Sequence, residues 1–427
     1  MMKTVNVGIL GFGTVGAGAV KLLLDNAEDI KQRVGAELRI KGIADLDTVT
    51  DRKIGYDVSG LLTGDALSLI NDPDIHIIVE TIGGVKPAES FVRAALGAGK
   101  SVVTANKMLI AKEGAGLMAL AREKGADLLF EASVGGGIPS IDPIKNNLAA
   151  NRINKIIGIV NGTTNYLLSE MKKGKNYSAA LKEAQSLGYA EQDPTSDVEG
   201  FDSMYKLAIL SRLCFNTEVC ADDIYREGIT SITDYDIKYA NEMGYQIRLL
   251  AMAERTGGQI YAAVHPALVP DEHPIAGVDG VMNAVFLSSD GAGDTMYYGA
   301  GAGSLPAGSA IAGDVAEAAR NILRGCRGAG AVACYNDIPV APAESLVRRN
   351  YIRIIVRDEA GCIAAISGAF ARYAVSLESI IQKNTKDGLA EVVWLTHAAE
   401  EERMRKALSE IEKIPLVDSI PSRIRVI

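Results

Sequence analysis

The sequence predicts an α/β protein in which a doubly wound parallel sheet of the Rossmann type is followed by an α+β domain and a small C-terminal module. Short apolar runs alternate with helix-period segments over about the first 130 residues, which is typical of parallel βαβ units. A Gly-rich turn follows the first of these runs. The length of 427 residues exceeds what one ordinary core holds and indicates two or three domains.

The composition excludes several classes of protein. With 48% apolar and 23% charged residues the chain is globular, so disorder is excluded as its main state. No apolar run approaches the roughly 18 to 20 residues that span a bilayer, and the segment from Met1 to Val7 lacks the apolar core of a signal peptide. A net charge of -9 argues against nucleic acid as the main partner. We therefore expect a cytoplasmic protein that binds neither membranes nor nucleic acids.

The spacing of the Cys and His residues limits the kinds of reaction that the protein could catalyse. The Cys residues contain no C-x-x-C pair, and their odd number in a large acidic chain indicates reduced, mostly buried thiols. The His residues lack the H-x-x-x-H spacing that puts two of them on one helix face. The residues concerned are Cys214, Cys220, Cys326, Cys334 and Cys362, and His76, His265, His273 and His397. The sequence disfavours a zinc enzyme, so we expect Lys, Asp, Glu or Tyr to transfer any proton.

A G-x-G-x-x-G turn joins the first strand to the first helix. The apolar run 5–10 predicts the strand, and a helix pattern covers 14–33. In this context the first Gly permits a tight turn, the second lets backbone approach a pyrophosphate, and the third lets helix and strand pack. We therefore predict dinucleotide binding at the helix N-terminus, although such turns also occur without nucleotide. The residues are Gly11, Phe12, Gly13, Thr14, Val15 and Gly16.

The second strand, 37–44, ends at Asp45. An acid at this point can accept hydrogen bonds from the adenosine ribose and would repel a 2′-phosphate, so the sequence favours NAD over NADP. Asp45 lies farther from the glycines than the usual spacing of about 20 residues, because the first helix is long. Its other interpretation is a helix-capping or turn residue, and the nearby Arg52 and Lys53 complicate the local charge.

Further βα units extend the sheet. Strands are expected at 75–80, 101–107 and 127–131, with helices at 87–98 and 111–124 between them. Ligands of a doubly wound sheet lie beyond the carboxyl ends of its strands. The candidates at these ends are Thr81, Gly83 and Lys107, of which the last has an equally good interpretation as a surface lysine.

The pattern changes from residue 131 onward. A Gly-rich crossover, 131–140, contains Pro139, which suits the first turn of the helix that we expect next. A strand at 153–160 and a helical hairpin follow. The loop after the hairpin is strongly acidic, with Glu191, Asp193 and Asp197 close together.

Asp202 and Lys206 lie four residues apart and therefore share one helix face. As an exposed pair they would stabilise the helix by only a few tenths of a kcal/mol. The next turns of this helix are apolar, however, which indicates a place at a cleft or in the interior. Because crowded acids repel and raise one another's pKa, the acidic loop before the helix fits a cationic group such as a substrate ammonium.

The remaining segments predict an open sheet and a separate module. Strands are expected at 260–264, 280–287 and 295–299. The Gly-rich segment 299–306 then begins a helix, 307–323, that we expect to return to the nucleotide domain, although a plain linker is nearly as good an interpretation.

A Gly-, Ala- and Pro-rich region, 327–348, separates this part from a βαββαβ pattern that is ferredoxin-like. Its strands are expected at 351–356, 377–382, 389–396 and 421–426, and its helices end near 373 and 412.

These motifs resemble one family, the monofunctional homoserine dehydrogenases with a C-terminal ACT domain. The resemblance covers essentially the whole chain. Its sharpest elements are the turn 11–16, the segment Thr104-Ala105-Asn106-Lys107, the crossover 131–139, the segment Asn161-Gly162-Thr163-Thr164-Asn165-Tyr166, and the stretch from Glu191-Gln192-Asp193-Pro194 through Asp202 to Lys206. The segments 358–361 and 376–382 look like ACT signatures.

The resemblance implies reversible NAD(P)H-dependent reduction of L-aspartate 4-semialdehyde to L-homoserine, in the route to threonine and methionine. It implies that Lys206 and Lys107 flank the reacting carbonyl, with Lys206 as the favoured proton donor and Asp202 beside them. A lysine with the ordinary pKa of about 10.4 is charged at neutral pH and can also stabilise an oxyanion. By the same resemblance the substrate contacts Gly162, Thr163, Glu191, Asp197 and Asp202, and the cofactor contacts also include Asp45, Thr81, Gly83, Lys107 and Gly303.

The resemblance also implies a monovalent cation (Na⁺ or K⁺), threonine as an effector, and a homodimer or homotetramer. The cation is expected near Glu131, Val134, Gly136 and Ile138, largely on main-chain oxygens. The expected domains are a nucleotide-binding domain, 1–133 with 306–330, a substrate-binding and dimerisation domain, 134–305, and an ACT domain, 348–427. Many relatives have a basic residue where this chain has Ala44-Asp45-Leu46-Asp47, which puts NADP preference in doubt.

Two other functions remain open from sequence. A semialdehyde dehydrogenase that forms a thiohemiacetal needs a nucleophilic Cys, and none of the Cys residues lies in the Gly-rich loops. A non-catalytic sensor would bind nucleotide and amino acid, and would tolerate exchange of Asp202 and Lys206.

Overall fold

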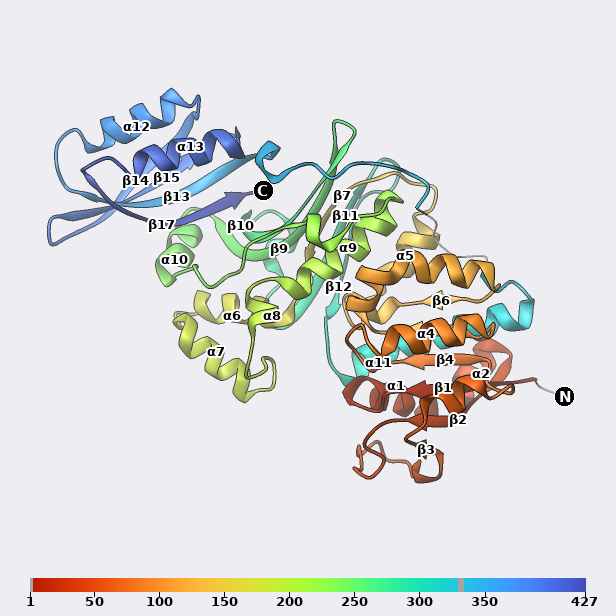
Figure 1. The fold of residues 1–427 in the computed structure, drawn as a ribbon. Coiled ribbons are helices and arrows are strands. Elements are labelled where there is room, and N and C mark those ends of the chain that lie inside the picture. Colours follow the sequence, from red (N-terminus) through yellow and green to blue (C-terminus); the bar gives the residue numbers. More distant parts are fainter. Residues whose placement is uncertain (1–2, 329–333) are drawn as a thin grey trace. The chain divides into compact units, whose positions relative to one another are not determined.

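The computed structural model describes residues 3–328 and 334–427. By its internal contacts the chain forms two compact units. Unit 1 consists of Met1–Val160, Tyr205–Asp223 and Met282–Ile338, and unit 2 consists of Asn161–Met204, Ile224–Val281 and Pro339–Ile427. Figure 1 shows the elements of both. No helix within the described ranges is long and apolar enough to cross a membrane.

Unit 1 contains a six-stranded parallel sheet in the order β3-β2-β1-β4-β5-β6. The chain adds β2 and β3 on one side of β1, and then β4, β5 and β6 on the other. The order therefore reverses between β1 and β4, where such sheets bind their ligands. The predicted Rossmann-type sheet is confirmed. Its strands are β1 Lys3–Leu10, β2 Ala36–Ala44, β3 Leu62–Thr63, β4 Ile77–Glu80, β5 Ser101–Thr104 and β6 Leu128–Leu129.

Helices pack on this sheet because their apolar faces join its core. The predicted helix 14–33 is in fact two helices, interrupted at Asn26. The helix predicted at 111–124 begins earlier, at Lys107, because the side chain of Asn106 accepts a hydrogen bond from Leu109 N–H and caps it. The helices are α1 Thr14–Asp25, α2 Ala27–Val34, η1 Ser59–Leu61, α3 Ala66–Asn71, α4 Ala88–Gly97, α5 Lys107–Glu123 and α11 Ser304–Arg324.

Unit 1 also contains three antiparallel strands in the order β12-β11-β7. The crossover before them differs from prediction in one respect. Pro139 lies in a non-helical segment, and the proline that enters a helical turn is Pro143. The elements are η2 Glu131–Ser133, η3 Pro143–Asn147, β7 Ile153–Ile159, η4 Ala221–Asp223, β11 Met282–Ser289 and β12 Gly293–Ala300.

Unit 2 begins with the helical hairpin α6 and α7, as predicted. It also contains β9, a twelve-residue strand that the sequence did not reveal and that pairs antiparallel with β10 over its whole length. Helix α9 spans Phe201–Phe215, so the boundary between the units passes through it. The elements are α6 Gly162–Lys172, α7 Tyr177–Ser186, α8 Thr195–Val198, β8 Tyr225–Arg226, α10 Asp234–Glu242, β9 Tyr245–Thr256, β10 Gln259–Pro270 and η5 Pro274–Gly277.

The C-terminal module of unit 2 has the strand order β17-β13-β15-β14. Numbered within the module this order is 4-1-3-2, so the ferredoxin-like prediction is confirmed. Figure 1 shows α12 and α13 together on one face of its strands, and Trp394 and Phe370 are buried in the core between the two layers. The elements are η6 Ala343–Ser345, β13 Val347–Arg357, α12 Cys362–Arg372, β14 Leu377–Lys386, β15 Leu389–Thr396, β16 Ala399–Glu400, α13 Glu401–Ile411 and β17 Val417–Val426.

The compact units do not coincide with the predicted domains, because β7, β11 and β12 group with the nucleotide-binding sheet. The predicted domain end at residue 330 and part of the region 327–348 lie outside the described residues.

Candidate active site

The Gly-rich turn between β1 and α1 has the shape that a dinucleotide requires. Gly11 has a φ of +94°, and a Cβ there would lie 2.8 Å from the main chain of Thr81. A Cβ on Gly16 would lie 2.1 Å from the carbonyl oxygen of Gly11. Gly13, in contrast, has nothing within 4 Å of its Cβ position, so backbone there is open to an incoming phosphate. The turn therefore fits a dinucleotide, with Thr14 and Val15 in the first turn of α1.

Asp45, at the end of β2, holds this turn in place. Its carboxylate accepts hydrogen bonds from the main-chain N–H of Phe12 and, over 2.8 Å, of Asp47. Arg52 lies 3.1 Å from the Asp47 carboxylate and 3.9 Å from that of Asp45. Hydrogen bonds from Thr50 and Val49, together with Arg52, lower the pKa of Asp47 to about 2. The interpretation of Asp45 as a turn residue is confirmed, and its contact with a ribose stays a prediction.

A cavity of about 620 Å³ lies beside the turn in unit 1. Phe12, Leu62 and the loop 48–59 line it. The loop includes Arg52 and Lys53, the two cations that complicate the prediction of an NAD preference.

Glu80, the last residue of β4, organises the next strand end. Its carboxylate accepts hydrogen bonds from Ile82 N–H over 2.7 Å, from Gly83 N–H over 3.3 Å and from the Thr104 hydroxyl over 2.6 Å. Burial raises the pKa of this carboxyl group, and these hydrogen bonds oppose the rise. The hydroxyl of the neighbouring Thr81 donates to Gly11 O over 2.8 Å, which ties the loop to the Gly-rich turn.

The Gly-rich segment before α11 reaches the same turn. Gly303, with a φ of +116°, precedes the helix, and the Ser304 hydroxyl donates to Thr14 O over 2.9 Å. A Cβ on Gly18 would lie 2.1 Å from Ser304 O, and one on Gly308 would lie 2.6 Å from Gly18, so glycines let α1 and α11 approach closely. The predicted return of this helix to the nucleotide-binding part is confirmed.

The loop predicted to hold a cation is tightly fixed. The Glu131 carboxylate accepts from the main-chain N–H groups of Ser140, Ile141 and Asp142 over 2.6 to 2.8 Å. Its own N–H donates to the buried carboxylate of Asp314 over 2.9 Å. Burial raises the pKa of Glu131, and that of Asp314 still more. The Glu131 side chain therefore fixes the main chain of residues 140–142.

The other residues predicted to lie near the cation belong to the same loop. Val134 and Ile138 are buried, and the Cβ position of Gly136 lies 2.5 Å from Gly301. The side chain of Asn283 lies against Gly301, and neither polar atom of this buried amide has a hydrogen-bond partner within the described residues. Across those residues, no group of three His, Cys, Asp or Glu side chains could hold a metal ion.

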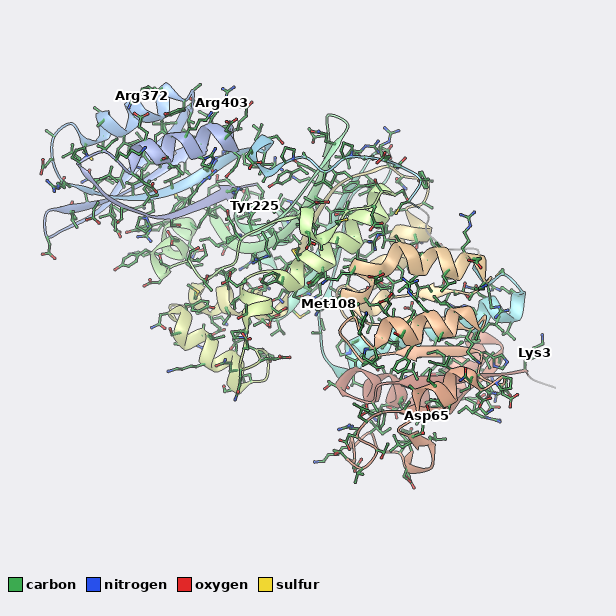
Figure 2. All side chains as sticks on the ribbon, in the orientation of Figure 1. Lys3, Asp65, Met108, Tyr225, Arg372 and Arg403 are labelled. Atoms are coloured by element: carbon green, nitrogen blue, oxygen red, sulfur yellow. The ribbon has the colours of Figure 1, made fainter. Side chains whose placement is uncertain are left out.

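The two predicted catalytic lysines lie on helices that pack together in unit 1. Lys107 begins α5, directly before Met108, which Figure 2 labels. Lys206 lies on α9; it is only 8% exposed, and its Nζ donates to Val160 O over 2.6 Å. The buried guanidinium of Arg212 on α9 donates to main-chain oxygens of α5, which fixes one helix on the other. Sequence analysis did not single out Arg212.

The predicted substrate acids have different environments in unit 2. Asp197 and Asp202 both accept hydrogen bonds from one amide, Nδ2 of Asn161, over 2.7 and 2.9 Å. Asp193 instead accepts from the N–H and hydroxyl of Thr195 at the start of α8. Glu191 is exposed. The acidic loop is therefore not one cluster: of its three acids, only Asp197 shares an amide with Asp202 of α9.

Gly162 and Thr163 form the first turn of α6, which Asn161 caps. The Thr163 hydroxyl donates to Tyr189 O over 2.5 Å, which joins the helix to the start of the acidic loop. Gly162 and Thr163 thus lie directly beside Asn161 in the chain, and Thr163 is buried.

Sequence analysis missed Glu80 and Asn161 as organising residues. Glu80 is the last residue of an apolar strand, and a charge there is a signal that could have been followed. Asn161 precedes a helix as an N-cap should, but its contacts to Asp197 and Asp202 join residues 36 and 41 positions away and have no local signal.

The prediction of mostly buried thiols is wrong, because only Cys214 and Cys362 are buried and the other three Cys residues are exposed. Cys214 is buried in α9, and burial raises its pKa well above the ordinary value. Burial also raises the pKa of Cys220 and Cys334, so neither has the activated thiolate that a thiohemiacetal mechanism needs.

Family models match three segments of the chain. "Homoserine dehydrogenase, NAD binding domain" matches 11–131, "Homoserine dehydrogenase" matches 139–316, and "ACT domain" matches 350–416. A homoserine dehydrogenase of Neisseria gonorrhoeae (strain FA 1090) is 42% identical over 432 residues, which cover 100% of this chain and 99% of that protein.

Solved structures agree. A homoserine dehydrogenase from Thiobacillus denitrificans is 40% identical, with a TM-score of 0.94 over 100% of this chain and 99% of that one. A hyperthermophilic archaeal homoserine dehydrogenase in complex with NADPH is 28% identical, with a TM-score of 0.63 over 74% of this chain and 97% of that one. These matches exclude both the thiol-dependent semialdehyde dehydrogenase and the non-catalytic sensor. The chain belongs to the homoserine dehydrogenase family and is an NAD(P)-dependent oxidoreductase with a C-terminal ACT domain.

Proposed function

We propose that Lys206 is the proton donor when this chain reduces L-aspartate 4-semialdehyde to L-homoserine. The burial of Lys206 supports this role: the side chain is 8% exposed and its Nζ donates to a main-chain carbonyl. Lysine is almost never buried this far unless a partner or a function requires it. Val160, which accepts the bond, directly precedes Asn161, the residue that holds Asp197 and Asp202.

The roles of the other residues follow from their charges. When bound, the reduced nicotinamide supplies a hydride to the aldehyde carbon. Lys206 gives a proton to the carbonyl oxygen, and the ammonium of Lys107 stabilises the negative charge that develops there. Asp197 and Asp202 bind the substrate ammonium, with Gly162, Thr163 and Glu191 as further contacts. In the reverse direction Lys206 accepts the proton of the homoserine hydroxyl.

Replacing Lys206 by Met tests the assignment. The variant loses the proton donor but keeps most of the side-chain volume, so we expect turnover to fall by about a hundredfold or more, while NADH binding, measured by fluorescence, is retained. Lys100→Met is the matched control, because Lys100 is also buried in unit 1 and donates to two main-chain carbonyls, those of Asp72 and Ile75. Wild-type turnover in Lys206→Met would exclude Lys206 as the donor.

We propose that the enzyme prefers NAD(H) over NADP(H). Asp45 and Asp47 place two carboxylates after β2, where a 2′-phosphate would meet negative charge. Arg52 is already paired with them, which reduces its availability to a phosphate. Steady-state rates with NADH and NADPH test this preference. A tenfold preference for NADPH would overturn it.

A monovalent cation, Na⁺ or K⁺, is proposed at the loop formed by Glu131, Val134, Gly136 and Ile138. Support comes from the fixed main chain of this loop and from the unpartnered amide of Asn283 against Gly301, since a buried amide without partners calls for a water or an ion. Replacement of K⁺ and Na⁺ by choline should lower the activity and the melting temperature together. Equal values in all three salts would exclude the site.

We further propose threonine as the effector of the ACT domain, and a cytoplasmic homodimer or homotetramer. The ACT match supports the first point, since such domains are expected to sense amino acids. We also propose three domains, 1–133 with 306–330, 134–305 and 348–427. The family models, at 11–131, 139–316 and 350–416, support the first boundary and the ACT domain. Rates with and without threonine, and the mass in solution, test these points.

A further inference from the structure

Asn161 uses all of its hydrogen-bonding capacity within unit 2. Its Nδ2 donates to Asp197 Oδ1 over 2.7 Å and to Asp202 Oδ2 over 2.9 Å. Its Oδ1 accepts from the N–H of Thr164 over 2.8 Å and from the hydroxyl of the same residue over 2.9 Å. An amide has two donor hydrogens and two acceptor lone pairs, so no capacity remains. The side chain is buried, with 4% exposed.

We propose that Asn161 is a positioning residue for substrate recognition: it holds the carboxylates of Asp197 and Asp202 side by side so that both face one substrate ammonium. The inference rests on the function proposed above and extends it to a residue outside the predicted site. Asn161 does not touch the reacting atoms in this role. It acts through the two acids.

The physical reason lies in the charge of the pair. Two carboxylates within reach of one amide repel each other, and Asp202 is only 3% exposed, so water screens the repulsion little. The two N–H groups of Asn161 offset this repulsion without adding a charge. An Arg or Lys in the same place would also hold the acids, but it would neutralise the charge that a substrate ammonium needs.

The other end of the amide explains why its position is fixed. By accepting from Thr164, Oδ1 caps α6, and the N-cap geometry fixes the side chain to the helix N-terminus. The positions of Asp197 on α8 and Asp202 on α9 are therefore both fixed relative to the N-terminus of α6. This helix also contains Gly162 and Thr163. Asn161 thus connects three helices that are separated in sequence.

The rival explanation is that Asn161 is only a helix cap. Asn176 allows the two roles to be separated, because it caps α7 in the same way, by accepting from Ala179 N–H over 2.9 Å, yet it is exposed. Serine is as good an N-cap as asparagine, but it cannot donate to two carboxylates at once. Asn161→Ser and Asn176→Ser therefore keep both caps and differ in the contacts to Asp197 and Asp202.

The experiment measures homoserine oxidation with both variants. For Asn161→Ser we expect the KM for homoserine to rise about tenfold, equivalent to about 1.4 kcal/mol, with the KM for NAD⁺ unchanged. The inhibition constant of 4-hydroxybutanoate, which is homoserine without its ammonium, should change less than twofold. Asn176→Ser should match the wild type in all three constants. This pattern would support positioning for the ammonium, because a general disturbance of the fold would weaken substrate and analogue alike.

An unchanged KM for homoserine in Asn161→Ser would overturn the inference, and so would an equal loss of affinity for homoserine and 4-hydroxybutanoate. If Asn161→Ser does not fold, as judged by its melting curve, Asn161→Thr provides the same readouts, since threonine can also cap the helix but cannot donate to two carboxylates at once. Failure of the proposed function is recognised separately. In that case Lys206→Met retains turnover, whatever the Asn161 variants do.

Discussion

Glu80 and Glu131 of unit 1 and Asp236 and Glu401 of unit 2 are carboxyl groups that the protein holds in opposite ways. In unit 1, Glu80 and Glu131 accept hydrogen bonds from N–H and hydroxyl groups, and burial raises the pKa of each. In unit 2, Asp236 forms an ion pair with Arg353 over 2.8 Å, and Glu401 forms one with Arg425 over 3.0 Å. Glu80 and Glu131 thus fix turns at strand ends, whereas Asp236 and Glu401 are held by arginines.

The arginine networks join the ACT module to the rest of unit 2. Arg353 on β13 contacts Asp236 on α10, and Arg425 on β17 contacts Glu227, directly after β8. Tyr225, labelled in Figure 2, donates to the same Glu227. Desolvation disfavours buried charges, so such pairs stabilise a fold only when both partners are present. We therefore expect Glu80 and Glu131 to tolerate neutralisation better than Asp236 and Glu401.

The largest expected effect is the loss of an arginine in unit 2. Arg353→Met removes the cation from Asp236, which is completely buried, and leaves an unpaired charge. We expect the free energy of unfolding of unit 2 to fall by about 3 to 5 kcal/mol, as measured by hydrogen exchange of peptides from β13 and β15. Asp236→Asn with Arg353→Met, which removes both charges, should restore most of the loss. A loss below about 1 kcal/mol in the single variant would show that Asp236 does not depend on the arginine.

Acid should act with opposite signs on two buried groups, His265 in unit 2 and Glu80 in unit 1. Burial, and then Arg425, lower the pKa of His265 to about 4. The folded state therefore binds fewer protons than the unfolded state, and this stability is lost as the pH falls from about 6.5 towards 4. At pH 5 the loss from His265 is about 2 kcal/mol. Glu80 has the opposite effect on stability, because its pKa is higher in the folded state than in the unfolded state. As the pH falls from the folded-state pKa to the unfolded-state pKa, the folded state of unit 1 gains stability.

Hydrogen exchange at pH 7 and pH 5, corrected for the intrinsic exchange rate, measures both changes in one sample. Peptides of β10 and β17 should lose protection relative to those of β1 and β4. His265→Leu removes the titrating group from unit 2, so it should abolish most of the difference. Equal responses of the two units in the wild type would refute the assignment of opposite signs.

The smallest effect is expected for Glu80→Gln in unit 1. The amide oxygen can accept from Ile82 and Gly83, and the amide N–H can donate to Thr104, whose hydroxyl also accepts. We expect a change in unfolding free energy of about 1 kcal/mol or less, measured by urea denaturation. Thr104→Val removes the hydroxyl that donates to Glu80 and also accepts from Asn106 N–H, so its loss sets an upper limit for this contact. A loss as large as that of Arg353→Met would mean that Glu80 functions as a charge.

Much of the fold was predictable because its signals are local. The alternation of apolar strands and helices over the first 130 residues or so predicted the parallel sheet, and the C-terminal βαββαβ pattern predicted the ferredoxin-like module. Strand β9 was not predicted, since its Leu, Ala, Met, Glu and Arg residues favour helix in isolation. Pairing with β10 across Gly257 and Gly258 makes it a strand, and this Gly-Gly turn was the available signal.

The candidate site was predictable only in part. Lys206 and Asp202 share a helix turn, and the Gly-rich turn has its own sequence signature, so both could be found from spacing. The division of the acidic loop into a capping acid, an exposed acid and one acid held by Asn161 could not be found. Spacing along a loop does not determine which acids meet, because loop dihedrals are not periodic.

The sequence by itself determined the order of the elements, the position of the nucleotide turn and the family, since periodicity, glycine geometry and motif spacing are all properties of neighbouring residues. Only the tertiary structure decided which buried charges are paired, that Glu80 and Asn161 organise their surroundings, and that Asp197 and Asp202 share one amide. The physical reason is distance along the chain. A hydrogen bond between residues about 40 positions apart depends on how whole elements pack, and no local pattern contains that information.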